Sequence, residues 1–176
     1  IRGMREKVTS YDNATVGSGS ALNEVVMEYG DSRNISKEYQ EHAGAKDAST
    51  LYVQYSFDTT ASSGELTKEL RPTSVRYPNG RLVHSTYGTS GSTDDVMSRL
   101  NAIKDDDSGS PGTAISEYTY LAGQIVKEDF VEPDVRLDYD SGTTGDYAGF
   151  DRFGRIVNQL WYNYGASANR DQFTYG

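Results

Sequence analysis

A short turn recurs along this chain, and its recurrence restricts the possible folds more than any other feature. The clearest copy covers residues 150–156, where Asp151, Gly154 and Arg155 sit between aromatic and aliphatic residues. Its ending, a glycine followed by a polar or basic residue and an aliphatic one, returns at Gly80-Arg81-Leu82 and at Gly123-Gln124-Ile125. Looser copies cover residues 29–35 and 95–100. A unit that recurs in this way is typical of a repeated hairpin.

The composition favours strands and turns over helices. The chain has 14 Tyr against 5 Phe and 1 Trp, together with 18 Gly, while hydrophobic residues make up 35% of its 176 residues. Tyrosine suits a half-buried strand, because its ring packs while its hydroxyl reaches water. We therefore predict an all-β protein of repeated antiparallel β-hairpins that form one continuous sheet with a thin or one-sided core.

Charge and cysteine content exclude several classes of partner and site. Acidic residues outnumber basic ones by 26 to 17, a balance opposite to that of nucleic-acid-binding proteins. The same excess disfavours anionic membrane surfaces, and no apolar run is long enough to span a bilayer. Because the chain has no Cys, disulfides and thiolate metal sites are excluded. We expect neither nucleic acid nor membrane insertion.

Alternating residues mark the strands. Leu51, Val53, Tyr55 and Phe57 alternate with polar or tyrosine neighbours, and a similar pattern begins at Val25. Residues 73–87 and 115–130 predict two hairpins, the first with an Asn-Gly turn that tolerates positive φ. Residues 1–24 are polar and weakly patterned. We expect them to be a leader or loop, and 25–176 to be one repeat domain that continues beyond both ends.

One segment supports two interpretations. In residues 93–104, Val96, Leu100 and Ile103 have helical spacing, and Ser92 with Asp95 resembles a capping box. The same residues match the repeated turn, with Ser98 in place of its glycine. We favour the hairpin, because the neighbouring units share it.

With these units aligned, the chain resembles the RHS/YD-repeat family. The family's unit is an aromatic-Asp-x-x-Gly-Arg turn between Tyr-rich strands, and residues 150–155 match it with Phe in place of Tyr. Tyr77 and Tyr120 occupy the place where Asp is expected, so those copies are degenerate. The resemblance covers residue 25 to the end.

The resemblance implies a long antiparallel sheet that spirals into a hollow shell or tube. It also implies a large bacterial protein that is secreted or displayed at the cell surface, where some members enclose a toxin domain and others act in adhesion. The family's self-cleaving segment has no counterpart here.

The sequence offers little for catalysis or metal binding. His84 lies in a predicted strand and His42 in a polar loop, and neither has a second ligand at metal-binding spacing. Asp105 and Asp107 form a weak calcium candidate, but they lack the spacing and closing Glu of an EF-hand, so a solvated acidic turn is favoured. We predict no catalytic residues and no cofactor.

A structural scaffold without catalysis is therefore the function that the sequence favours. Its partners would be neighbouring repeats, identical subunits or an enclosed cargo domain. One alternative is an adhesin that binds glycans or a partner through strand aromatics, with Trp161, Tyr162 and Tyr164 as the candidate platform. Another is a subunit that assembles into filaments by strand addition.

Overall fold

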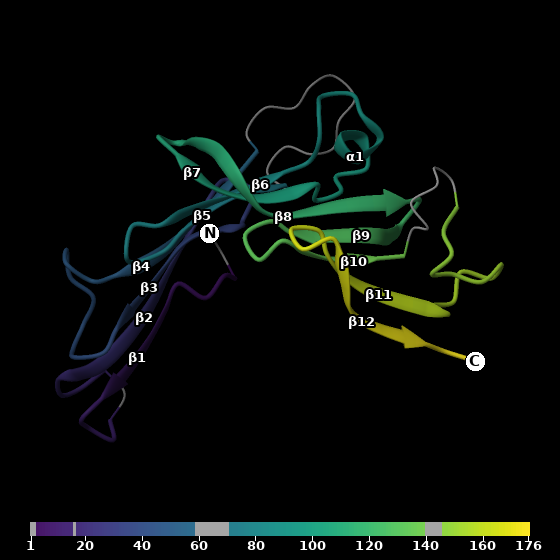
Figure 1. Cartoon of the computed structure of the whole chain (residues 1–176). Coiled ribbons are helices and arrows are strands. Elements are labelled where there is room, and N and C mark those ends of the chain that lie inside the picture. Colours follow the sequence, from purple (N-terminus) through teal and green to yellow (C-terminus); the bar gives the residue numbers. More distant parts are fainter. Residues whose placement is uncertain (1–2, 16, 59–70, 140–145) are drawn as a thin grey trace. The chain divides into compact units, whose positions relative to one another are not determined.

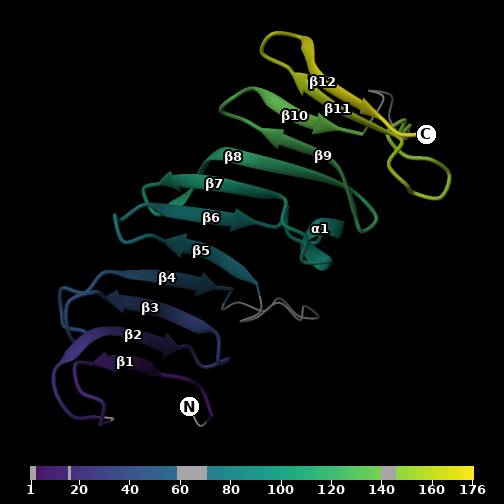
Figure 2. The ribbon, with the colours of Figure 1, turned by 90° about the horizontal axis from the view of Figure 1, so that it is seen from below.

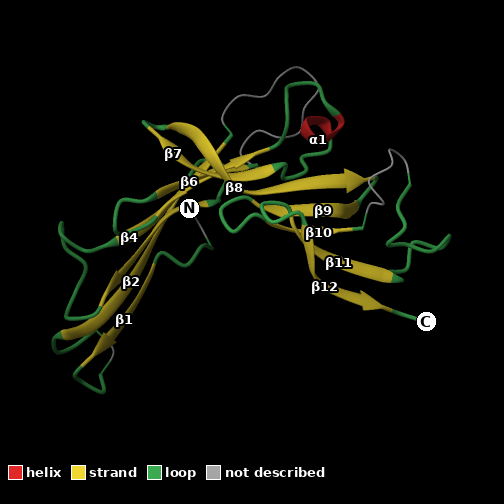
Figure 3. Cartoon of the chain, viewed as in Figure 1, coloured by secondary structure: helices red, strands yellow, loops and turns green. Residues whose placement is uncertain are grey.

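A computed structural model describes residues 3–15, 17–58, 71–139 and 146–176. The described residues are almost entirely strands and turns, with one short helix (Figure 3). Every strand pair in the resolved ladders is antiparallel, and the strands follow one another in the sheet in chain order from β1 to β12. The predicted all-β class with successive antiparallel hairpins is confirmed.

The strands and the helix divide between two compact units, residues 1–84 and 85–176 (Figure 1). The first unit contains β1 (Lys7–Tyr11), β2 (Ala21–Tyr29), β3 (Ile35–Glu41), β4 (Tyr52–Phe57), β5 (Pro72–Arg76) and the start of β6 (Leu82–Thr86). The second contains the end of β6, α1 (Thr93–Val96), β7 (Ala102–Asp107), β8 (Ser110–Leu121), β9 (Gln124–Phe130), β10 (Val135–Asp138), β11 (Asn158–Asn163) and β12 (Ala168–Thr174).

In the first unit, register assigns each side chain to a face of the sheet. Lys7, Val26, Tyr39 and Tyr52 lie opposite one another on β1 to β4, so they share one face. Because successive strand residues point to opposite faces, Val53 belongs to the other face. Figure 2 shows the strands of this unit lying side by side in the same order.

The core is thin, as the composition predicts. Among the described residues, only four apolar side chains are buried: Tyr39, Ala102, Val126 and Tyr139. Several large apolar side chains are well exposed, including Leu51 at 63% and Phe153 at 68%. Because little apolar area is removed from water, backbone hydrogen bonds in the ladders and turns contribute much of what holds each unit together.

The segment 1–24 is more regular than its sequence suggests. It contains β1 and the first residues of β2, which pair from Lys7↔Val26 to Tyr11↔Ala21. The apolar pattern of β1 is weak because polar contacts hold it: the Thr9 hydroxyl and the Lys7 ammonium both contact the Glu24 carboxylate. The structure thus places a paired strand within residues 1–24, for which the sequence predicts a leader or loop.

The hairpin interpretation of residues 93–104 is wrong for the first part of that segment. Residues Thr93–Val96 form one helical turn, and the Ser92 hydroxyl accepts the Asp95 N–H at 3.2 Å, as the capping pattern indicates. Ser98, at the position of the repeat's glycine, does adopt the left-handed conformation with φ 53°, but it ends the helix. Strand β7 begins only at Ala102 and turns at Ser108-Gly109 into β8.

Candidate functional site: the repeat turns and the β4 notch

The turn at 150–156 is organised by one carboxylate. Asp151 Oδ1 accepts the N–H groups of Phe153 at 2.8 Å and Arg155 at 2.9 Å. Its Oδ2 accepts Arg155 Nε and also lies 2.7 Å from Arg155 Nη2. Hydrogen bonding from the Arg155 main chain, and then from its guanidinium, lowers the pKa of Asp151. Gly154 supplies the left-handed residue, with φ 76°.

Two other copies form the same backbone turn with different side chains. In residues 150–156, the Asp151 N–H donates to the Arg155 carbonyl and the Gly154 N–H donates to the Asp151 carbonyl. Residues 77–81 repeat both bonds, with Tyr77 in the place of Asp151 and Gly80 in the left-handed position. Residues 30–34 repeat them as well, with Arg33 in that position at φ 66°. These three copies therefore share one geometry, which tolerates loss of the aspartate.

The copy at Tyr120 departs from this geometry. Leu121 pairs with Gln124, which leaves a loop of the two residues Ala122-Gly123, and Ala122 takes the positive φ of 51°. A bulge next to Tyr120 shifts the register by one residue. Gly123 therefore lies in a turn, as predicted, but the turn is shorter than that of the other copies.

The three aromatic residues near β11 do not form one platform. Trp161 pairs with Leu137, and its ring stacks on Phe130 with centroids 6.2 Å apart. Tyr162 follows it in the strand and so points to the opposite face, where the Arg136 guanidinium lies 5.1 Å from its ring. The Tyr164 hydroxyl, beyond the end of β11, donates at 3.3 Å toward the carbonyl of Phe130. These contacts use the aromatic side chains for packing within the second unit.

The candidate metal residues and histidines occupy ordinary places in the sheet. Asp105 and Asp107 lie in β7, next to a turn where the Asp106 carboxylate accepts the Gly109 N–H at 3.1 Å. In the described part of the chain, no group of three or more His, Asp and Glu residues could hold a metal ion. His84 lies on β6 opposite Ser74 and is 8% exposed, whereas His42 is exposed beyond β3.

A row of aromatic and cationic side chains crosses one face of the first unit. The rings of Tyr39 and Tyr52 are 5.1 Å apart and tilted by 47°. Lys46 Nζ lies 4.1 Å from the centroid of Tyr39, and Lys37 Nζ lies 5.0 Å from that of Tyr52. Cation–π attraction therefore adds to the packing on the β3 side of Tyr52.

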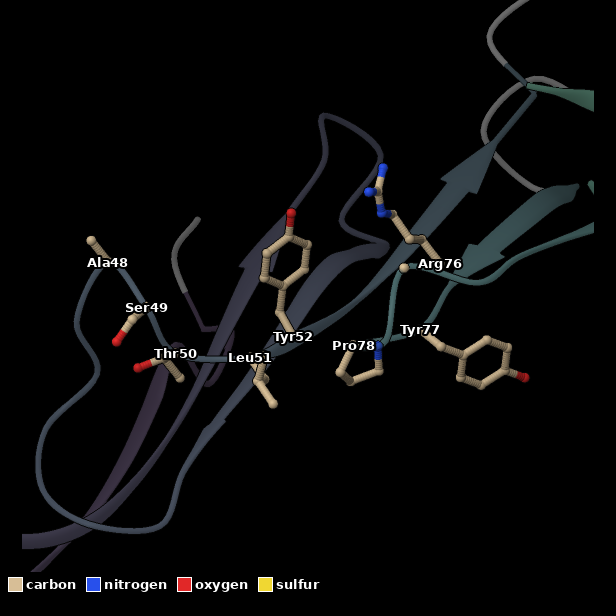
Figure 4. A pocket seen from close by; sticks show the side chains of 9 residues that line it. Ala48, Ser49, Thr50, Leu51, Tyr52, Arg76, Tyr77 and Pro78 are labelled. Carbon is tan, nitrogen blue, oxygen red and sulfur yellow. The ribbon is translucent and has the colours of Figure 1, made fainter. Parts of the chain in front are cut away.

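The opposite flank of Tyr52 borders a depression of about 180 Å³. We name it the β4 notch, and it is lined by Ala48, Ser49, Thr50, Leu51, Tyr52, Arg76, Tyr77, Pro78 and Gly80. The notch exists because β4 begins at Tyr52, two residues before Gln54, the first β4 residue that pairs with β5 (Gln54↔Arg76). Figure 4 shows the side chains of Tyr52 and Arg76 projecting to the same side, with Leu51 and Pro78 directed away from them.

Three carboxylates fix the loop between β3 and β4 that forms one rim of the notch. The Glu41 carboxylate accepts a hydrogen bond from the Thr50 hydroxyl at 2.6 Å, and this bond lowers the pKa of Glu41. The Asp47 carboxylate accepts one from the Ser49 hydroxyl, which lowers the pKa of Asp47. Glu24 accepts the Lys46 N–H at 2.9 Å. The Thr9 hydroxyl first, then the Lys46 N–H and the Lys7 ammonium, lower the pKa of Glu24 to about 2.

The sequence does not identify Arg76 and Tyr52 as site residues. They line the notch because pairing between β4 and β5 ends at Gln54↔Arg76, and the sequence alone does not give this register. Pro78 was an available signal, since a proline without an N–H at the end of a strand leaves a neighbouring carbonyl without its donor.

Comparison with known proteins identifies the fold. No family model matches the sequence, and no curated protein matches it. Two solved structures share the fold over 97% of this chain, each with a TM-score of 0.58. One is the Photorhabdus luminescens Tc holotoxin pore with a mutated TccC3, at 12% identity, and the other is TcdB2-TccC3-TEV, at 13%. This chain spans 8% of the length of each.

Proposed function

We propose that this chain is a structural segment whose role is to extend a sheet and present its surfaces, without catalysis of its own. The observation that carries the proposal is the combination of consecutive antiparallel hairpins with very few buried apolar side chains. A hairpin unit of this kind gains stability by stacking on its neighbours, and stability is then close to a sum over adjacent units.

The fold likeness and the repeat turns support the same proposal. The similar structures are a Tc holotoxin pore and a TcdB2–TccC3 protein, in which this fold is a small part of a long chain. Together with the YD-type turn at Asp151, they support a role within a shell or tube of a large bacterial protein that is secreted or exposed at the cell surface. Within the described residues, no helix is long and apolar enough to cross a bilayer.

Stepwise shortening of the sheet tests this proposal. Deleting 165–176 removes β12, and deleting 1–20 removes β1. For a scaffold of stacked hairpins, each deletion lowers the melting temperature modestly and leaves the remaining β-structure intact by circular dichroism and amide exchange. Loss of all β-structure after either deletion would instead indicate one cooperative domain and would contradict the scaffold proposal.

Self-assembly is a second candidate, favoured by the edge strands. All seven residues of β12 are exposed, and Phe173 is 46% exposed. An exposed strand edge offers unpaired N–H and C=O groups to another strand. Sedimentation at increasing protein concentration, with Arg170→Pro in β12 as the edge-blocking variant, tests this candidate. Filaments or oligomers that persist in the proline variant would rule out assembly through β12.

A further inference from the structure

Arg76 lines the β4 notch, in a chain that is acidic overall. It closes β5, its side chain is exposed, and its guanidinium contacts no carboxylate in the described part of the chain. Acidic residues outnumber basic ones by 26 to 17 in the chain as a whole. A guanidinium presents parallel N–H groups that match a carboxylate. Arg76 therefore provides one half of a carboxylate site.

The main chain of Tyr52 provides a second donor beside it. The Leu51 carbonyl accepts the Gln40 N–H on the β3 side of the strand. Successive residues alternate the direction of their backbone groups, so the N–H and C=O of Tyr52 point toward β5. Continuing the register from Gln54↔Arg76 places Pro78 opposite Tyr52. Pro78 has no N–H and belongs to a turn that bonds within itself, so the Tyr52 backbone faces the notch.

The other groups around the notch limit what it can hold. The Thr50 hydroxyl is engaged by Glu41 at 2.6 Å and the Ser49 hydroxyl by Asp47 at 2.8 Å. These two rim hydroxyls therefore contribute little to a ligand. At about 180 Å³, the notch is smaller than the roughly 300–1,000 Å³ of typical small-molecule sites. It accommodates a group about the size of one amino-acid residue.

We propose that the β4 notch binds the C-terminal carboxylate of an extended peptide. Arg76 pairs with the carboxylate, the Tyr52 N–H donates a hydrogen bond to it, and the Tyr52 carbonyl accepts an N–H from the peptide's last residues. This combines strand addition with capture of a chain end, two known modes of peptide recognition. Charge complementarity selects this occupant, because Arg76 lacks a carboxylate of its own in the described structure.

Titration of the intact chain with short peptides, followed by amide NMR shifts, tests the proposal. The probes are N-acetylated Ala-Ala-Val with a free carboxylate, the same peptide with a C-terminal amide, and an amidated peptide with an internal Glu. We expect the free acid to bind with a Kd of about a millimolar, with shifts at Tyr52 and Arg76. The amide and the internal-Glu peptide should bind at least tenfold more weakly, because the charge-assisted pair at the chain end is lost.

Variants locate the site. Arg76→Ala should weaken binding of the free acid at least tenfold. Arg76→Lys should weaken it less, because lysine keeps the positive charge but lacks the parallel N–H groups of a guanidinium. Arg152→Ala, another exposed arginine far along the chain, is the matched control and should bind as the native chain does. If Arg76→Ala fails to fold, Arg76→Gln replaces it.

Three results would overturn the proposal. Equal binding of acid and amide would remove the carboxylate from the interaction. Equal binding of the internal-Glu peptide would show that the notch does not distinguish a chain end from a side chain. Binding of glucuronate as tight as that of the free-acid peptide, with the same dependence on Arg76, would assign the notch to acidic sugars.

Discussion

Gly149 allows two segments of the second unit to approach unusually closely. A Cβ at this position would lie 2.7 Å from both Cα and Cβ of Tyr139, and the first of these atoms is main chain. The Gly149 N–H donates to the Tyr139 carbonyl at 2.9 Å, and its carbonyl accepts the Val157 N–H at 2.8 Å. The substitution Gly149→Ala therefore forces the backbones apart at the entry to the Asp151 turn.

The expected cost follows from these contacts. Overpacking against atoms that cannot rotate away costs about 1–3 kcal/mol, and weakening a backbone hydrogen bond adds about 0.5–1.5 kcal/mol. We expect a total loss of about 1.5–4.5 kcal/mol in the free energy of unfolding. For a chain of this size, that corresponds to a fall of about 3–18 °C in melting temperature.

Thermal unfolding followed by far-ultraviolet circular dichroism measures this fall, and hydrogen exchange of the Val157 amide reports the local opening. Gly123→Ala is the matched control, because an added Cβ there meets no atom within 4 Å and Gly123 has no positive φ. The control should shift the melting temperature by less than about 2 °C. If Gly149→Ala melts like the native chain, or if the control falls as far, the close-approach argument is refuted.

Three further predictions concern a carboxylate, a turn and the core. The pKa of Glu24 is about 2 in the folded chain against an ordinary 4.5, so its contribution is complete above pH 4.5 and is lost as pH falls toward 2. Thermal unfolding at pH 7 and pH 3 should therefore differ more in the native chain than in Glu24→Gln. Asp151→Asn should speed amide exchange at Arg155, because a charged acceptor is lost, while melting within about 2 °C of the native chain. Val126→Ala, at a side chain only 1% exposed, should cost about 2 kcal/mol and lower the melting temperature by about 4–8 °C.

The sequence predicts the fold wherever a turn imposes a backbone conformation that few residues tolerate. Gly80 and Gly154 both adopt positive φ, at 88° and 76°, in turns with the same hydrogen bonds. The alternation of side chains along a strand then fixes which face each residue occupies, so that Tyr52 and Val53 of β4 lie on opposite faces. Class, strand order and several hairpins follow from these local rules.

Prediction fails where one residue changes the register or where a short polar cap overrides a pattern. One extra residue in β9, Val126, lies opposite the step from Thr119 to Tyr120 and leaves a turn of only two residues. The identities of the neighbouring residues do not predict this bulge. At Ser92, one hydroxyl bonded to Asp95 is enough to start a helical turn in a segment that also matches the repeat. In β1, contacts to Glu24 replace the apolar pattern by which strands are recognised.

The β4 notch belongs to a further class of feature, which depends on where two neighbouring strands end. A sheet of repeated hairpins exposes few backbone groups except at its edges, so local recognition has to arise where pairing stops early. Pairing between β4 and β5 stops at Arg76, because Pro78 cannot donate and Gly80 turns the chain toward β6. Pro78 and Gly80 thus belong to a repeat turn and also leave the β4 notch beside it unpaired. A change that lengthens β5 by one pair, such as Pro78→Val, should fill the notch and weaken peptide binding while preserving the hairpin, which amide exchange at Arg81 can verify.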